Sequence, residues 1–192
     1  MKTSILTILA YFIMCGVSYA RDVYITQSGA TLTADINQDG QTNKFGDSTT
    51  AVTLTGDTQT LDIDQIGNTN TIATSLIGAI QEFTLRQAGN SNTSTVSVGS
   101  NSAAGDNSII QTLTGSSNTT TVNVGNSAAS GDADIDLTAT GDSNTVTINE
   151  NSTATMIGSD KKVTSITAIG GSNTITSTHT GAADQDTTLH HT

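Results

Sequence analysis

The chain has 192 residues, a formal net charge of −11 at pH 7, and neither proline nor tryptophan. Threonine, serine, glycine, asparagine and glutamine make up about half of it, with 34% hydrophobic and 12% charged residues. This composition excludes a highly charged disordered chain and a conventional helical bundle. Since proline cannot donate the hydrogen bond that a sheet ladder needs, its absence indicates continuous β-structure. The acidic balance argues against nucleic acid as a partner.

The first 20 residues have the pattern of an export signal. Lys2 carries the positive charge, the apolar run Ile5 to Val17 follows, and small residues permit cleavage after Ala20. The apolar run is too short to span a membrane, and we expect no membrane span elsewhere. We therefore expect a secreted protein that is extracellular or held at the cell surface.

Internal repeats organise residues 21–178. The motif Gly-x-Ser/Thr-Asn recurs along this region, with weaker copies that begin at Gly29 and Gly56. The glycine and asparagine of the six full copies are Gly40 and Asn43, Gly67 and Asn70, Gly89 and Asn92, Gly115 and Asn118, Gly141 and Asn144, and Gly170 and Asn173.

Apolar residues alternate on both sides of each motif, so each repeat reads as strand, tight arc, strand. We expect the arc glycine to supply a positive φ angle and the arc asparagine to bond the bend. Stacked repeats then form an all-β fold, a β-solenoid of about six rungs with amyloid-like stacking. The expected inward positions are Gln27, Gln38, Gln65, Gln87, Ile25, Ile36, Ile63, Leu85, Leu113, Leu137 and Ile166.

Three repeats match a longer pattern, an apolar strand followed by Gln-x-Gly-x-x-Asn. They run from Ile36 to Asn43, from Ile63 to Asn70 and from Leu85 to Asn92. This pattern resembles the curlin repeat of the curli subunits, which are bacterial functional amyloids. The resemblance implies an extracellular fibre subunit, from a Gram-negative bacterium, that polymerises end to end and supports adhesion and biofilm matrix. The glutamine of the pattern is replaced by Leu113, Ala139 and Ala168 in the later repeats.

Polymerisation is also expected on physical grounds, because a solenoid without capping elements ends in two exposed strand edges. Residues 179–192 read as a polar tail, and the alternative is that this tail forms a solvated cap. The expected partners are other copies of the chain, a related curli-like subunit, and surface or matrix components.

A second function is suggested by threonine pairs that follow four of the arcs. They should point toward solvent and resemble the flat threonine arrays of ice-binding proteins, although threonine also favours exposed strands without any ligand. The pairs are Thr93 and Thr95, Thr119 and Thr121, Thr145 and Thr147, and Thr174 and Thr176.

Metal and catalytic sites are not expected. Asp35 to Gly40 begins like a calcium loop, but the twelfth position is Gly46 rather than an acidic residue. The three histidines, His179, His190 and His191, lie in the terminal segment, where weak metal binding is less common than simple solvation. No catalytic constellation is found, so we expect a protein that is not an enzyme and needs no cofactor.

Overall fold

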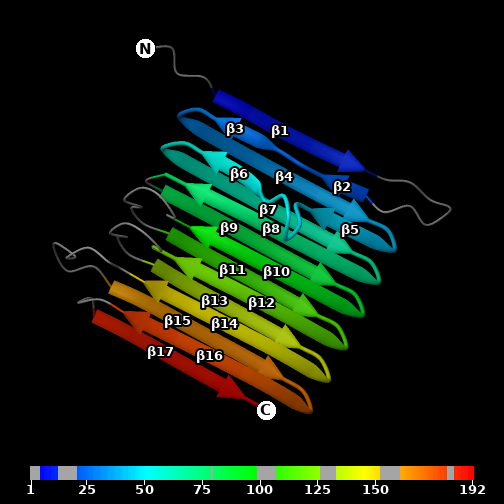
Figure 1. The fold of residues 1–192 in the computed structure, drawn as a ribbon, viewed down its shortest axis with the longest axis vertical. Helices are drawn as coiled ribbons and strands as arrows, with labels where there is room; N and C mark the ends of the chain where they lie inside the picture. The colour runs from blue at the N-terminus through cyan, green and yellow to red at the C-terminus, as the bar shows by residue number, and fades with distance from the viewer. Residues whose placement is uncertain are drawn as a thin grey trace.

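The computed structural model describes residues 5–12, 21–78, 80–98, 107–125, 133–151, 161–180 and 184–192. Within these ranges the regular structure is β-strand, arranged in two parallel sheets that we call sheet A and sheet B. The chain alternates between the sheets and forms a β-solenoid of about five turns (Figure 1). The predicted fold class is thus confirmed. None of the described segments is a helix of the length and apolar character needed to cross a membrane.

Sheet A contains eight strands. In their order across the sheet they are β1 (Ile5–Phe12), β4 (Thr31–Asp39), β7 (Thr58–Ile66), β9 (Ile80–Ala88), β11 (Asn107–Thr114), β13 (Ala133–Thr140), β15 (Lys161–Ile169) and β17 (Asp184–His191).

Sheet B contains nine strands, seven of them along one path. These seven are β16 (Ser172–Thr180), β14 (Ser143–Asn151), β12 (Ser117–Val124), β10 (Ser91–Val98), β8 (Thr69–Ile77), β5 (Thr42–Phe45) and β2 (Arg21–Val23). The other two are β3 (Thr26–Ser28), which pairs with β6, and β6 (Val52–Thr55), which also pairs with β8.

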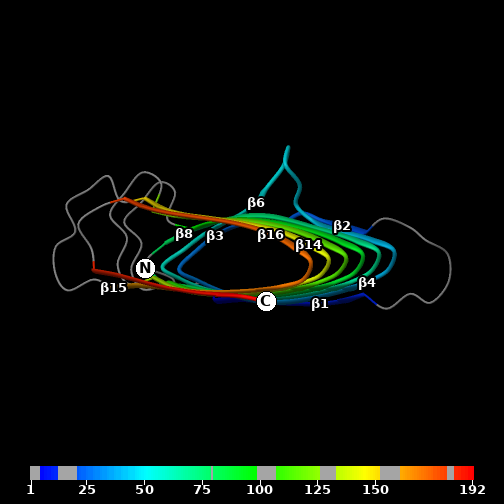
Figure 2. The ribbon, with the colours of Figure 1, turned by 90° about the horizontal axis from the view of Figure 1, so that it is seen from below.

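The solenoid is flattened, with the two sheets facing one another and tight arcs along one side (Figure 2). Each arc leads from a strand of sheet A to a strand of sheet B and contains one Gly-x-Ser/Thr-Asn motif. The repeat period sets the register, because every arc asparagine pairs with the arc asparagine of the next turn, from Asn43 through to Asn173.

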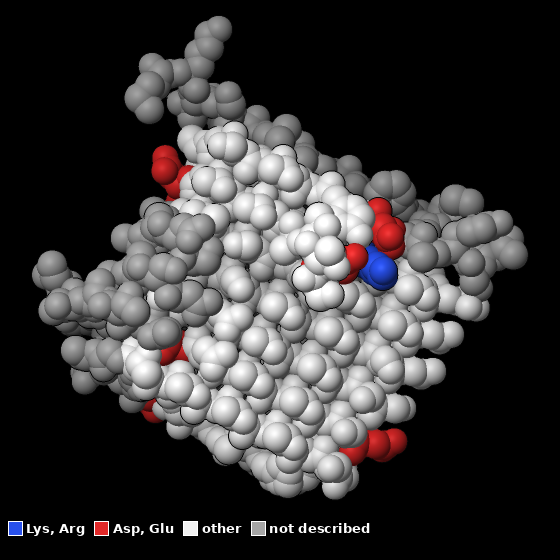
Figure 3. Space-filling view, viewed as in Figure 1, with Lys and Arg blue, Asp and Glu red and all other residues white. Residues whose placement is uncertain are grey.

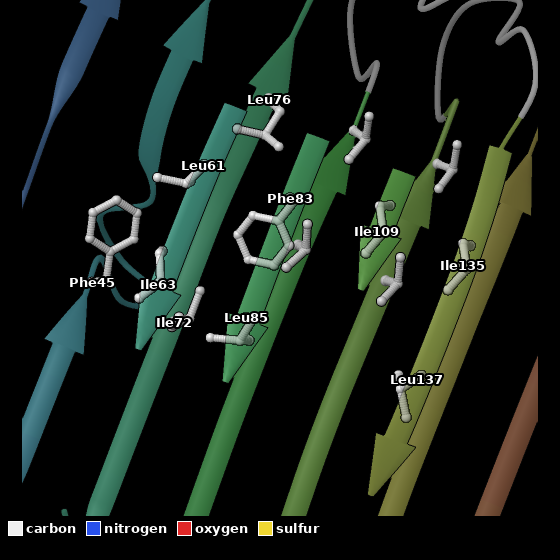
Figure 4. Packing of buried hydrophobic residues seen from close by; sticks show 14 of the residues in the cluster. Phe45, Leu61, Ile63, Ile72, Leu76, Phe83, Leu85, Ile109, Ile135 and Leu137 are labelled. Carbon is white, nitrogen blue, oxygen red and sulfur yellow. The ribbon is translucent and has the colours of Figure 1, made fainter. Parts of the chain in front are cut away.

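The core lies between the two sheets and is lined by alternate residues of each strand. In β12, for example, Asn118, Thr120, Val122 and Val124 are buried. Figure 4 shows the apolar part of this core, including Phe45 and Phe83, with aliphatic side chains from neighbouring turns beside them. Burial of each large apolar side chain contributes about 1.5–3 kcal/mol, so every turn adds its own share of stability.

The two ends of the chain both contain strands. Residues 5–12, assigned to the expected export signal, form β1 and pair in register with β4. The expected cleavage position after Ala20 lies outside the described residues. Residues 184–191, assigned to a polar tail, form β17 and pair with β15, so the solenoid extends further than the repeat motif.

Candidate self-assembly surfaces

The arc glycines are needed for close approach between turns. The expectation that they supply positive φ angles is wrong for all but Gly170, since the other described glycines with positive φ are Gly46 and Gly125, which are not arc glycines. A Cβ atom added to Gly115 would lie 1.8 Å from the carbonyl oxygen of Gly89. Neighbouring arcs lie only about 4.8 Å apart, so no side chain fits between them.

A second glycine column lies on the opposite side of the solenoid. A Cβ atom on Gly56 would lie 2.1 Å from the carbonyl oxygen of Gly29, and one on Gly78 would lie 1.6 Å from that of Gly56. Gly29 and Gly56, which the sequence presents as weak arc copies, therefore lie at the turns by which sheet B strands return to sheet A.

The arc asparagines form a continuous ladder along the solenoid. Each side-chain Nδ2 donates to Oδ1 of the next asparagine, for example from Asn92 to Asn118 at 2.7 Å. The same Nδ2 of Asn92 donates to the carbonyl oxygen of Thr114 at 3.0 Å. This satisfies both hydrogens of a buried amide, which would otherwise cost free energy.

The asparagine ladder has a direction, with its donors pointing toward the C-terminal end. At its first rung, Oδ1 of Asn43 is buried and has no hydrogen-bond partner among the described residues. At its last rung, Nδ2 of Asn173 donates to Gly170 of its own arc at 3.1 Å. The first rung is not at the edge of sheet B, because β2 lies beyond it with Arg21 as the register partner of Asn43.

A shorter glutamine ladder runs in the opposite direction. Nε2 of Gln65 donates to Oε1 of Gln38 at 2.6 Å, and Nε2 of Gln87 donates to Oε1 of Gln65 at 2.8 Å. The ladder stops at Leu113, so Oε1 of Gln87 is buried and has no partner in the part of the chain that the structure describes. The fourth predicted glutamine, Gln27, is buried in β3 and pairs in register with Leu54, so it lies outside this ladder.

The predicted aliphatic positions all face the core. The buried ones are Ile36, Ile63, Leu85, Leu113, Leu137 and Ile166, while Ile25 is half-buried and packs against the cluster. In the register between β9 and β11, Leu113 lies opposite Gln87 and Gln111 lies opposite Leu85. The leucine thus continues the column of glutamines, and the glutamine continues the column of aliphatic residues. Oε1 of Gln111 accepts a hydrogen bond from Thr120 at 2.7 Å, which satisfies that oxygen within the core.

Sequence reasoning missed a contact between two ionisable residues near the C-terminal end, the buried Glu150 and the partly buried His179. Glu150 of β14 has no exposed surface and accepts a hydrogen bond from Thr164. Its Oε2 lies 3.1 Å from Nδ1 of His179, without the alignment of a hydrogen bond. The two residues are partners in the register between β14 and β16. They are brought together by the register between β14 and β16, which depends on the length of the last repeat, including residues 152–160 outside the described ranges.

The outer face of sheet B carries the predicted threonine pairs. Thr93, Thr119, Thr145 and Thr174 form one row in register, and Thr95, Thr121, Thr147 and Thr176 form a second. All are exposed except Thr121 and Thr147, which are half-buried. The rows are about 6.6 Å apart along a strand, and neighbouring threonines within a row are about 4.8 Å apart. Figure 3 shows this face, which has few charged groups.

The outer face of sheet A is acidic instead. Asp35 and Asp62 are register partners on β4 and β7, and Asp64 and Glu82 lie nearby. Desolvation, followed by repulsion from Asp64, Asp35 and Glu82, raises the pKa of Asp62 above its usual value. The residues that resemble a calcium loop lie along β4 as an extended strand, and no metal-ligand cluster is found among the described residues.

Among the described strands, those at the two ends of the solenoid have an unpaired edge. At the C-terminal end, β17 is the outermost strand of sheet A and β16 is the outermost strand of sheet B. Leu189 on β17 is 56% exposed and Ile175 on β16 is half-buried, although their register partners Ile166 and Val146 are buried. The core is therefore open at this end.

Comparisons of the chain with models of protein families, with curated proteins and with solved structures found no match.

Proposed function

We propose that this chain is a structural subunit of an extracellular amyloid-like fibre, which assembles by stacking solenoids end to end. The observation that carries the proposal is the open C-terminal end, where two strand edges and the apolar side chain of Leu189 are exposed together. Unpaired parallel edges next to apolar side chains favour the addition of another strand.

The interior of the solenoid supports the same proposal. The same buried asparagine bond repeats from turn to turn between Asn43 and Asn173, as identical side chains repeat along an amyloid-like stack. A fibre built this way would need no partner other than the chain itself.

The proposed location and use of the fibre rest on the sequence. The export signal expected in residues 1–20 favours secretion, and the curlin-like motifs favour a surface fibre that supports adhesion and biofilm matrix. A related subunit and surface or matrix components remain proposed partners. The role is structural, without catalysis.

Electron microscopy and fibre diffraction of residues 21–192, incubated at neutral pH, test this function. Unbranched fibres with reflections near ~4.7 Å and ~10 Å are expected. A β-rich protein that stays monomeric at high concentration would overturn the proposal.

Ice binding is the second candidate, because the threonine rows are outward, in register and surrounded by few charges. An assay of ice recrystallisation inhibition tests it with Thr119→Leu, which disturbs the face of sheet B. Thr112→Leu is the matched control, since Thr112 is exposed on the face of sheet A. Loss of inhibition in the first variant alone supports this function, and no inhibition by the unaltered protein excludes it.

A further inference from the structure

In the chain from Arg21 onward, each end of the solenoid has an incomplete turn, and the two incomplete turns are complementary. The first strands, β2 and β3, belong to sheet B, whereas the last strand, β17, belongs to sheet A. A second copy could therefore place its β4 against β17 and its β2 and β3 against β16. Each end would complete the half turn that the other lacks.

We propose that β17 of one copy pairs with β4 of the next, and that residues 5–12 occupy this same edge of β4 until they are removed. The inference rests on the proposed fibre function and identifies the surfaces that meet. It also makes β1 an internal block on assembly, because a strand edge in a sheet accepts only one neighbour.

The core column of sheet A supports this pairing. The column that contains Ile36 continues in register through the sheet and ends at the exposed Leu189. One further step in the same register places Leu189 against Ile36 of a second copy. In the full chain that position opposite Ile36 is held by Ala10 of β1.

The core column of sheet B leads to the same joint. It begins at Val23, passes through Phe45 and ends at Ile175. Val23 and Ile175 are both partly buried residues packed against the core. Stacking places Ile175 of one copy on Val23 of the next, which would remove apolar surface from water on both.

The charges on the outer face of sheet A are compatible with this register. The column of Asp35 ends at Thr188, and the column of Thr33 ends at Asp186. Asp35 of a second copy would therefore face Thr188, and its Thr33 would face Asp186. The joint avoids the repulsion that two aspartates cause where Asp35 lies beside Asp62.

The block by residues 5–12 is tested by comparing fibre growth of residues 1–192 with that of residues 21–192, both seeded with fibres of residues 21–192. The longer chain should elongate at least about tenfold more slowly, which corresponds to an unfavourable difference of at least about 1.4 kcal/mol. The double substitution Ile8→Pro with Leu9→Pro in residues 1–192 should restore growth. Since alternate residues face opposite sides, one of these prolines removes a donor that faces β4.

The role of β17 is tested at its outer edge. The amide and carbonyl of Thr192 both bond toward β15, with Ala168 and Gly170. By alternation, the amide of Leu189 faces away from β15, so Leu189→Pro removes an outward donor and preserves the internal pairing. Leu189→Ala is the matched control, because it shortens the same side chain but keeps the donor.

Residues 21–192 with Leu189→Pro should add to existing fibres through β4 and then block further addition. A small fraction of this variant should therefore reduce elongation of the unaltered protein about tenfold, while Leu189→Ala at the same fraction should not. If residues 21–192 form fibres, but residues 1–192 grow equally fast or the proline variant is incorporated without effect, the inference fails and the proposed function stands. If residues 21–192 form no fibres, both fail.

Discussion

The side-chain Nδ2 of Asn92 donates to Oδ1 of Asn118 at 2.7 Å, within the core and between two neighbouring turns of the solenoid. Both residues are buried, with 1% of their surface exposed. Each arc is thereby tied to the next by a side chain as well as by the main chain.

Asn92→Asp should destabilise the fold by at least about 3 kcal/mol, because it removes this donor and leaves an unpaired charge in the core. Thr93→Asp is the matched control, since it adds the same charge at the neighbouring exposed position. Urea unfolding followed by circular dichroism measures both. Equal midpoints for the two variants would contradict the buried position of Asn92.

Gly115→Ala should be strongly destabilising, because its Cβ atom would lie 1.8 Å from the carbonyl oxygen of Gly89. We expect a loss of about 2 kcal/mol or more, or failure to fold, since two backbones would have to separate. Gly171→Ala is the control, as its Cβ atom would meet nothing closer than 3.8 Å. The prediction fails if thermal unfolding finds the two variants equally stable.

Asp62→Asn should stabilise the protein at pH 7. Desolvation and the neighbouring Asp64, Asp35 and Glu82 raise the pKa of Asp62 above 3.8, so the folded state holds this proton more tightly than the unfolded state. The contribution of Asp62 to stability is therefore present below pH 3.8 and is lost as the pH rises through the folded pKa.

Urea unfolding at several pH values tests this sign. The advantage of Asp62→Asn over the unaltered protein should be largest near neutral pH and should disappear below the pKa of the unfolded state. An advantage that is the same at acidic and neutral pH would show that charge is not its cause.

His179→Ala should destabilise the last turn, because it leaves the carboxylate of Glu150 buried without its ionisable partner. The loss should be smaller by about 1 kcal/mol or more when Glu150→Gln is also present, since the substituted side chain no longer has the carboxylate oxygen that faces His179. A double-mutant cycle measures this coupling by urea unfolding. A coupling of zero would mean that the two side chains do not interact.

Much of the fold could be predicted from the repeats. Alternating apolar residues define two-sided strands, and the spacing from Gly40 to Asn43 and onward to Gly170 and Asn173 marks every arc. Because one register slip would turn an entire strand inside out, this spacing also determines which residues face the core. The asparagine ladder follows directly from that register.

Other features depend on how the turns stack. The close approach of Gly115 to Gly89, the opposite directions of the two amide ladders, and the contact of Glu150 with His179 all join residues in different turns. They depend on the spacing between backbones and on side-chain orientation, neither of which a linear pattern contains.

The sequence by itself determined the repeat, the arcs and the inward and outward sides of each strand, because these depend on local alternation and on single residue types. Only the tertiary structure decided that residues 5–12 lie on β4 and that residues 184–191 continue sheet A as β17. Neither segment carries the arc motif. Each segment is placed by main-chain hydrogen bonds to the edge of a strand far away in the sequence. Because many different sequences can form such bonds, the residues of the segment do not reveal the pairing.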